Sequence, residues 1–209
     1  MTHPSIPRWL EWAREIQALS QIGLTFSTNE HQTANFKRLR SIASEMAAEQ
    51  SGLAQDDFLR SFSAQPGYAT AKIDVRGAVV RHGRILLVQE RSDKHWCLPG
   101  GWADVGEIPS AMVAREVLEE SGFVVRPVKI VGVFDANRGG RPLEFFHAYK
   151  IIFFCEIVSG QPRPSLETSD VKFFNFEDLP PLSINRTNLR HLGEVRAHLR
   201  DASRPAAFD

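Results

Sequence analysis

The chain has 209 residues, of which 43% are hydrophobic, and 25 basic residues balance 25 acidic ones to give a formal net charge of zero. This length and apolar content suffice for a packed core, in one large domain or in a domain with an appendage. The zero net charge argues against the broad electrostatic attraction that drives non-specific nucleic-acid binding.

No apolar stretch approaches the roughly 20 residues of a membrane span. The first seven residues lack the basic and apolar regions of a secretory signal. We therefore expect a cytoplasmic protein without a membrane partner, in which Cys97 and Cys155 are buried reduced thiols.

The first part of the chain, residues 1–62, is predicted to be a small helical domain. Apolar residues recur at helical spacing in two runs that are separated by Gly23 and the polar residues 27–30. These two stripes comprise Trp9, Trp12, Ala13, Ile16 and Leu19, and Phe36, Leu39, Ala43 and Met46. Two helices alone bury little surface, so we expect the stripes to pack on the main domain or on a second subunit. A homodimer formed through these helices is the expected assembly.

After a short helix over 56–62 and a linker over 63–67, residues 68–203 are predicted to form the main domain. The β-rich runs 75–80 and 85–88 flank a turn at 81–84 and indicate a hairpin. Further strands are expected over residues 96–98, 124–134, 147–157 and 171–176. A last helix is expected over residues 186–199, following the prolines at 180 and 181.

A second helix of this domain is acidic on one face. Pro109 opens its pattern and Gly122 closes it. Glu116, Glu119 and Glu120 stand at i, i+3 and i+4, so their Cβ atoms lie about 5–6 Å apart. Like charges this close repel each other, and the spacing makes sense when a divalent cation lies between them. An all-carboxylate site suits Mg²⁺, with Mn²⁺ as a substitute, better than zinc.

The segment around this helix resembles the Nudix box. That pattern is Gly, five residues, Glu, seven residues, Arg-Glu, an apolar residue, any residue, Glu-Glu, any residue, Gly and an apolar residue. Its specified places are filled by Gly101, Glu107, Arg115, Glu116, Val117, Glu119, Glu120, Gly122 and Phe123. The resemblance implies an α/β protein with an α/β/α sandwich on a mixed sheet. It also implies a metal-dependent hydrolase that cleaves a nucleoside diphosphate linked to another moiety, X.

Other segments resemble one bacterial branch of this family, named for hydrolases of X-linked nucleoside diphosphates, which carries a helical N-terminal extension. They are residues 9–12, 17–25, 71–77, 85–88, 96–102, 149–156 and 179–183. This branch is often dimeric, and its substrates include ADP-ribose and CDP-alcohols, which yield a nucleoside monophosphate and a phosphorylated X. The proline that marks many ADP-ribose pyrophosphatases beyond the box is displaced to Pro142, which argues against ADP-ribose without excluding it.

The resemblance implies that Glu116, Glu119 and Glu120 are metal ligands, completed by a backbone carbonyl near Gly100 or Gly101. Arg115 is expected to orient a ligand carboxylate through a bidentate pair. Glu107 is expected either to bind the metal through water or to hold the loop.

The general base is not fixed by the box. Glu120 itself and Glu167, on a loop before the last strand, are candidates, and Asp170 competes with Glu167. Three residues are candidate substrate contacts: Arg76 for phosphate, and Trp102 and Phe134 for stacking on a base. Each has a structural alternative, a cross-strand partner for the arginine and the core for the aromatic residues.

Two other functions remain open at this point: a nucleotide-sensing regulator on the same fold, and an RNA-processing hydrolase. The intact glutamates favour an enzyme. A regulator that binds nucleic acid would need a basic helix, and the short cluster Lys37–Arg40 has acidic residues nearby. The identity of X and of the nucleobase is left open.

Overall fold

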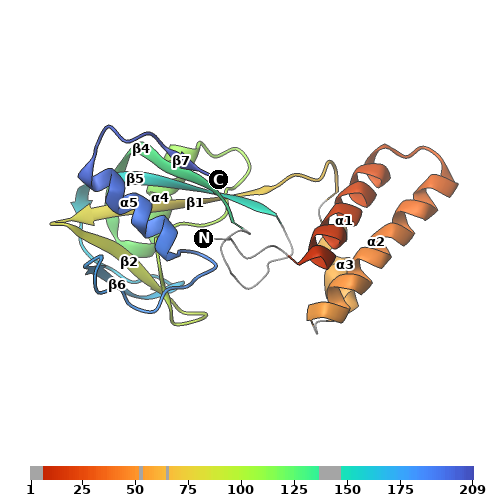
Figure 1. Ribbon diagram of the computed structural model, residues 1–209, viewed down its shortest axis with the longest axis horizontal. Coiled ribbons are helices and arrows are strands. Elements are labelled where there is room, and N and C mark those ends of the chain that lie inside the picture. Colours follow the sequence, from red (N-terminus) through yellow and green to blue (C-terminus); the bar gives the residue numbers. More distant parts are fainter. Residues whose placement is uncertain (1–6, 52–53, 65, 137–146) are drawn as a thin grey trace. The chain divides into compact units, whose positions relative to one another are not determined.

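The computed structural model describes residues 7–51, 54–64, 66–136 and 147–209. These residues fall into two compact units (Figure 1). The helical unit holds the residues up to Ala71 together with His147, and the sheet unit holds Lys72–Ala136 and Ala148–Asp209.

The helical unit is built on the expected hairpin, α1 (Arg8–Phe26) and α2 (Glu30–Ser51), followed by α3 (Gln55–Ser63). The hairpin buries mostly small or polar side chains, namely Leu10, Ala13, Gln17 and Ser20 on α1 and Ala43, Ser44 and Ala47 on α2. Ser20 Oγ donates to the Phe36 carbonyl at 2.6 Å. Small side chains let two helix backbones approach closely, so the hairpin closes on this face.

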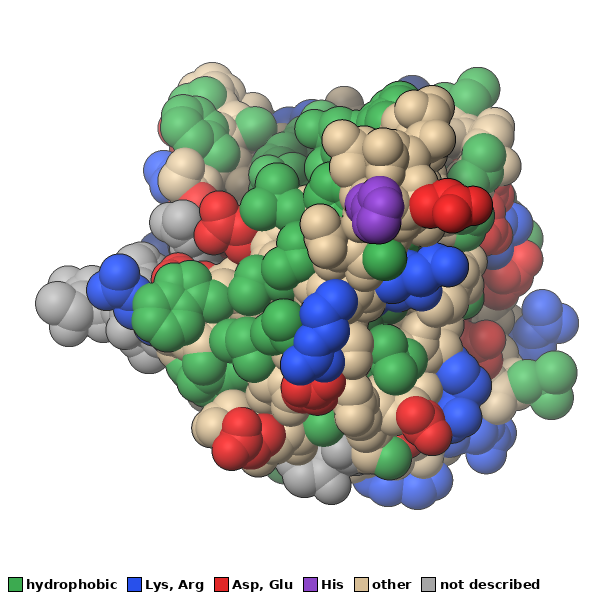
Figure 2. All heavy atoms as spheres, turned by 90° about the vertical axis from the view of Figure 1, so that its right-hand side faces the viewer, with side chains coloured by type: hydrophobic (Ala, Val, Ile, Leu, Met, Phe, Trp, Pro, Cys, Tyr) green, Lys and Arg blue, Asp and Glu red, His purple; other side chains and the backbone are tan. Residues whose placement is uncertain are grey.

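The apolar stripe predicted on α1 is only partly buried within the helical unit, as expected if two helices alone cannot cover it. Of its five residues only Ala13 is buried, while Trp12 is 48% exposed and Leu19 is 56% exposed. Figure 2 looks onto the side of the molecule that lies at the right of Figure 1, and it shows hydrophobic side chains among charged ones of both signs. Trp12 and Leu19 thus lie outside the buried part of the hairpin, whereas Leu10 is buried in it.

The sheet unit contains seven strands and two helices among the described residues. Its strands are β1 (Lys72–Arg81), β2 (Arg84–Glu90), β3 (Trp96–Cys97), β4 (Phe123–Asp135), β5 (Ala148–Gly160), β6 (Thr168–Phe174) and β7 (Ala207–Phe208). They lie in the order β3-β2-β1-β5-β4-β7, and β6 pairs with β2. Because β1 runs parallel to β5 but antiparallel to β2, the sheet is mixed, as expected.

The helices α4 (Pro109–Ser121) and α5 (Leu189–Arg200) cover opposite faces of this sheet. Alternate residues of a strand point to opposite faces. On β1, Val75 and Val79 join the core cluster of α4, whereas Ala78 joins that of α5. Gly77 allows α4 to approach, because a Cβ there would overlap the Val117 side chain. The result is the predicted α/β/α sandwich.

The turn between β1 and β2 and the start of α5 are each set by local residues. His82 and Gly83 both adopt positive φ angles, 52° and 73°, which gives the tight turn predicted between β1 and β2. The last helix begins at Leu189, later than the predicted residue 186, because Asn188 caps it and accepts from the His191 N–H at 3.0 Å. Arg186 consequently belongs to the preceding loop.

Candidate active site

A glycine loop after β3 lies against the edge of β1. The N–H of Gly77 donates to the Pro99 carbonyl at 2.8 Å, and the N–H of Val75 donates to the Gly101 carbonyl at 2.9 Å. Between them Gly100 has φ +141°, and a Cβ at this position would overlap the carbonyl oxygen of Val75. Only glycine adopts this conformation at such a close approach.

The acidic helix α4 faces this loop. It begins at Pro109 and is closed by Gly122 at φ 78°, as predicted. Glu116, Glu119 and Glu120 all line a cleft of about 540 Å³. Gly100 and Gly101 line the same cleft, so the structure brings together the sequence-predicted ligands.

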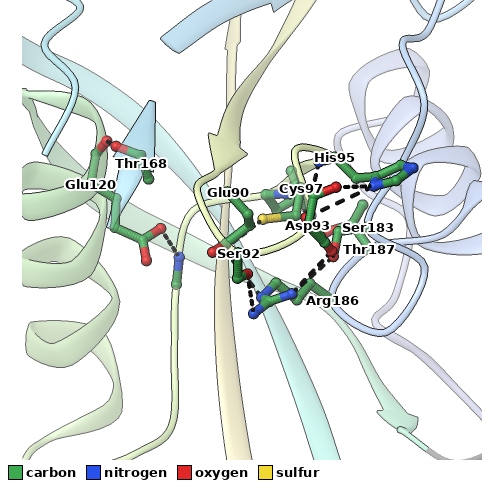
Figure 3. A network of polar contacts seen from close by, with 12 residues as sticks. Glu90, Ser92, Asp93, His95, Cys97, Glu120, Thr168, Ser183, Arg186 and Thr187 are labelled. Atoms are coloured by element: carbon green, nitrogen blue, oxygen red, sulfur yellow. Dashed lines mark hydrogen bonds and ion pairs between the residues drawn. The ribbon is translucent and has the colours of Figure 1, made fainter. Parts of the chain in front are cut away.

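Glu120 is the most buried of the three, at 5% exposure. Its carboxylate accepts the Gly100 N–H at 3.0 Å, and its backbone carbonyl accepts the Thr168 hydroxyl at 2.9 Å (Figure 3). Burial raises its pKa to about 8, although Arg76 and the Gly100 N–H act in the opposite direction. Burial also raises the pKa of Glu116, against the effect of Arg115. Both carboxylates therefore lack enough positive charge around them.

Arg115 is held by several carboxylates at once. It makes a bidentate pair with Glu107, at 2.8 Å for both contacts, and single contacts to Glu119 at 2.8 Å and Glu116 at 3.1 Å. The predicted bidentate partner was a metal ligand, and the observed one is Glu107. Glu107 is not among the residues that line the cleft, and its pKa is lowered by hydrogen bonds from Arg115.

The donor set fits a hard divalent cation, because buried carboxylates with raised pKa values are stabilised by added positive charge. Within the described part of the chain, however, no three acidic, histidine or cysteine side chains are assembled as a ready metal site. Glu119 is instead engaged by Arg115. The carbonyl of Gly101 already accepts one hydrogen bond, from Val75, and has a second lone pair available.

Arg76 lines the cleft and is 5% exposed, so its interpretation as a surface cross-strand partner is wrong. Its Nε donates to Asp74 at 2.8 Å and its Nη1 donates to the Leu98 carbonyl at 3.2 Å. Asp74 also pairs with Lys150, which is fully buried. Burial alone would raise the pKa of Asp74, but the two cations outweigh it and lower that pKa.

The two aromatic candidates, Trp102 and Phe134, differ in location and in exposure. Trp102 lines the cleft and is 49% exposed, with the Lys72 ammonium 6.0 Å from its ring centroid. Phe134 is 1% exposed and packs in the core on the α5 side of the sheet, where its ring lies 5.0 Å from that of His191. The interpretation of Phe134 as a base-stacking residue is therefore wrong.

The two candidate bases Glu167 and Asp170 also lie in different environments. Glu167 lines the cleft, and its backbone carbonyl accepts the Arg91 N–H at 3.0 Å. Asp170 lies on β6 outside the cleft lining and pairs with Lys172. The hydrogen bond from Lys172 lowers the pKa of Asp170.

The NUDIX domain matches residues 72–192, which include the glycine loop, α4 and the cleft. This chain belongs to the NUDIX family. Residues 7–62 of this Nudix hydrolase match a second family, described as a UDP-X-like N-terminal oligomerisation domain.

Three relatives show what this Nudix hydrolase is similar to. A Bacillus subtilis (strain 168) protein named "Putative ADP-ribose pyrophosphatase YjhB" is 36% identical and aligns over 97% of each chain. A crystal structure of a UDP-X diphosphatase has 28% identity and a TM-score of 0.62, covering 96% of this chain and 98% of that one. An ADP-ribose pyrophosphatase from Streptococcus suis 89-1591 has 34% identity and a TM-score of 0.61, covering 67% and 100%.

Sequence reasoning missed four residues that line the cleft of this Nudix hydrolase: Ser165 and Leu166, which precede Glu167, and Glu90 and Arg186. Glu90 ends β2 and Arg186 precedes α5, and both line the cleft. The carboxylate at the end of an apolar strand was an available signal for Glu90. The signal for Arg186 was the capping pattern of Asn188, which excludes Arg186 from the helix.

Among the described helices, none has the length and apolar character that crossing a membrane requires.

Proposed function

We propose that this Nudix hydrolase cleaves the diphosphate of a nucleoside diphosphate joined to a second moiety X, giving a nucleoside monophosphate and phospho-X. The observation that carries the proposal is that all three box glutamates and Arg76 line one cleft. The relatives with the printed activity ADP-ribose pyrophosphatase support ribose as X, and the one named UDP-X diphosphatase supports a nucleoside diphosphate linked to X.

Glu116, Glu119 and Glu120, with a carbonyl oxygen of Gly100 or Gly101, would hold Mg²⁺. A bound divalent cation neutralises phosphate oxygens and acidifies water during phosphoryl chemistry. The family generally uses divalent cations, and the carboxylate-rich donor set favours Mg²⁺ or Mn²⁺. Arg115 engages only Oε2 of Glu119, so Oε1 is left for such an ion, and the bidentate pair with Glu107 holds Arg115 in place.

The remaining roles follow from position. Arg76 is fixed by Asp74 and faces the cleft beside Glu120, so it is placed to donate to a phosphate oxygen of the substrate. Glu167 is exposed in the cleft lining, where it can accept the proton of an attacking water. Glu120 is a less suitable base when its charge is committed to a cation. Trp102 is exposed in the cleft lining, which supports our proposal that it stacks on the nucleobase.

A hydrolysis experiment tests the proposal. The purified protein is incubated with Mg²⁺ and ADP-ribose, UDP-glucose or CDP-choline in ¹⁸O-labelled water, and the products are separated and weighed by mass spectrometry. We expect one labelled oxygen in either the nucleoside monophosphate or the phospho-X. Inorganic phosphate as the main product, or no hydrolysis of any of the three substrates, would contradict the proposal.

We also propose that the helical unit assembles the enzyme as a homodimer. Support comes from the match of residues 7–62 to an oligomerisation domain and from the large apolar side chains Trp12 and Leu19, which the hairpin leaves exposed. Such side chains are common in the buried centres of protein interfaces.

A further inference from the structure

One wall of the cleft carries an ion pair that the proposed reaction does not use. Arg186 Nε lies 3.2 Å from Glu90 Oε1, and both residues line the cleft together with Glu120. Figure 3 shows Glu90 between Glu120 on one side and Arg186 on the other. The pair joins the end of β2 to the loop before α5, two segments that are distant in the sequence.

The guanidinium of Arg186 is held by hydrogen bonds to residues of two loops. Its Nη1 donates to Ser183 Oγ at 3.0 Å and to Asp93 Oδ2 at 3.3 Å. Among the described residues, the acceptor near Nη2 is Ser92 Oγ at 3.5 Å, which is a long contact. An arginine has five N–H donors, so Nη2 retains hydrogen-bonding capacity for a ligand.

Glu90 supplies an acceptor beside this donor. Its Oε1 accepts the thiol of Cys97, with a sulfur–oxygen distance of 3.3 Å, and faces Arg186 Nε. Its Oε2 accepts no hydrogen bond from the residues that the structure describes, and it is not one of the fully buried side-chain atoms without a partner, so it reaches the solvent of the cleft. A ligand hydroxyl in the cleft can therefore donate to it in place of water.

The charges of this wall select the kind of ligand. Glu90 and Asp93 place two carboxylates against the single guanidinium of Arg186, so the local charge disfavours a second phosphate. A quaternary ammonium group binds best to a cage of aromatic faces, and Trp102 is the only aromatic residue in the described cleft lining. A hydroxyl fits best, because it both donates to a carboxylate and accepts from a guanidinium.

We propose that Glu90 and Arg186 bind a hydroxyl of an uncharged sugar in the X moiety and so select substrates whose X is a sugar. This inference rests on the proposed diphosphate hydrolysis. Asp93 and Ser183 are positioning residues, since they hold Arg186 from the loop side.

The test compares two substrates that differ only in X: ADP-ribose and the methyl ester of ADP, which has no hydroxyl in X. The variants are Glu90→Gln, which keeps the side-chain shape, and Arg186→Lys, which keeps the charge. Each is expected to raise KM for ADP-ribose roughly tenfold, the size of one hydrogen bond to a charged group. The kcat/KM for the methyl ester should stay within about twofold of wild type.

The exposed pair Arg204 and Glu194 provides the matched control, because its contacts of 3.0–3.3 Å lie on α5 and the loop after it and do not line the cleft. Arg204→Lys and Glu194→Gln should leave KM and kcat/KM unchanged for both substrates. Equal losses on ADP-ribose and on the methyl ester, or no loss on either, would overturn the sugar subsite alone. A wild-type enzyme that hydrolyses neither substrate would overturn the proposed function as well.

Discussion

The carboxylate of Glu120 accepts a hydrogen bond from the backbone N–H of Gly100, with a nitrogen–oxygen distance of 3.0 Å. This contact joins the end of the acidic helix to the glycine loop. A third segment joins them, because the Thr168 hydroxyl donates to the Glu120 carbonyl. Helix, loop and the start of β6 are therefore positioned together around one buried carboxylate, which explains why a distortion of any of them would reach the cleft.

Replacing Glu120 by Gln should abolish most turnover while the protein stays folded. The amide keeps an acceptor for the Gly100 N–H but loses the charge that would hold a divalent cation. Metal assistance lowers a barrier by several kcal/mol, so kcat should fall at least about 100-fold at saturating Mg²⁺. Steady-state kinetics measures this, and Glu156→Gln, on an exposed pair with Arg126, is the control. A variant within about threefold of wild type would contradict the role of Glu120.

The stability of the metal-free protein should fall as the pH rises towards 8. The pKa of Glu120 is raised from 4.5 to about 8 in the folded protein, so between these values the folded state holds a proton that the unfolded state has lost. The free energy of unfolding then decreases with pH, with a slope of at most about 1.4 kcal/mol per pH unit from this group. Urea denaturation in EDTA at several pH values measures the slope.

Glu120→Gln provides the comparison for that measurement. The variant should be more stable than wild type at pH 8 and about equally stable near pH 4.5, because the neutral amide never ionises. Mg²⁺ should stabilise wild type at pH 8 more than it stabilises the variant. Parallel pH profiles for the two proteins would show that Glu120 titrates normally.

Local signals were enough to predict most elements of the sheet unit, although β7 (Ala207–Phe208) lies beyond the predicted domain end at residue 203 and was not among them. Pro109 and Gly122 delimit α4, and the turn at His82 and Gly83 needs the positive φ angles that are most accessible to glycine. These features depend on residues that are neighbours in the sequence, whereas the α/β/α sandwich was expected from the resemblance to the Nudix family.

Which side chains are buried, and which distant residues pair with each other, could not be predicted in this way. The sequence pattern predicted the stripe on α1 but not which of its members the hairpin would bury: Ala13 is fully buried, whereas Trp12 is 48% exposed. Phe134 at the end of β4 has the same sequence pattern whether its ring enters the core or the cleft. The pairing of Glu90 with Arg186 depends on how distant segments meet.

Asp74→Asn should destabilise the protein strongly, because it leaves the buried Arg76 and Lys150 without their shared counter-charge. Removing one partner of a buried ion pair costs roughly 3–5 kcal/mol. Asp170→Asn is the control, since its pair with Lys172 is largely exposed and should cost no more than about 1 kcal/mol. Urea denaturation at pH 7 measures the loss in the free energy of unfolding for both variants. Equal small losses would mean that the Asp74 site is hydrated or neutral.

The last prediction concerns the face of α1 that the hairpin leaves open. Trp12 and Leu19 are 48% and 56% exposed, so replacing both by Ala should leave the hairpin folded. If this face meets a second copy of the chain, the double variant should shift the protein towards monomer in sedimentation experiments. A tryptophan at the centre of an interface costs upwards of about 2 kcal/mol when truncated.

Leu10→Ala separates assembly from folding. Leu10 is 2% exposed inside the hairpin, so this variant should lower the stability of the helical unit by roughly 2–5 kcal/mol. Turnover per subunit should survive in Trp12→Ala with Leu19→Ala, because the box residues all lie between 101 and 123 in the sheet unit. A double variant that remains dimeric would place the subunit contact elsewhere. A wild-type protein that sediments as a monomer at high concentration would refute the dimer itself, since exposed apolar side chains alone do not require a partner.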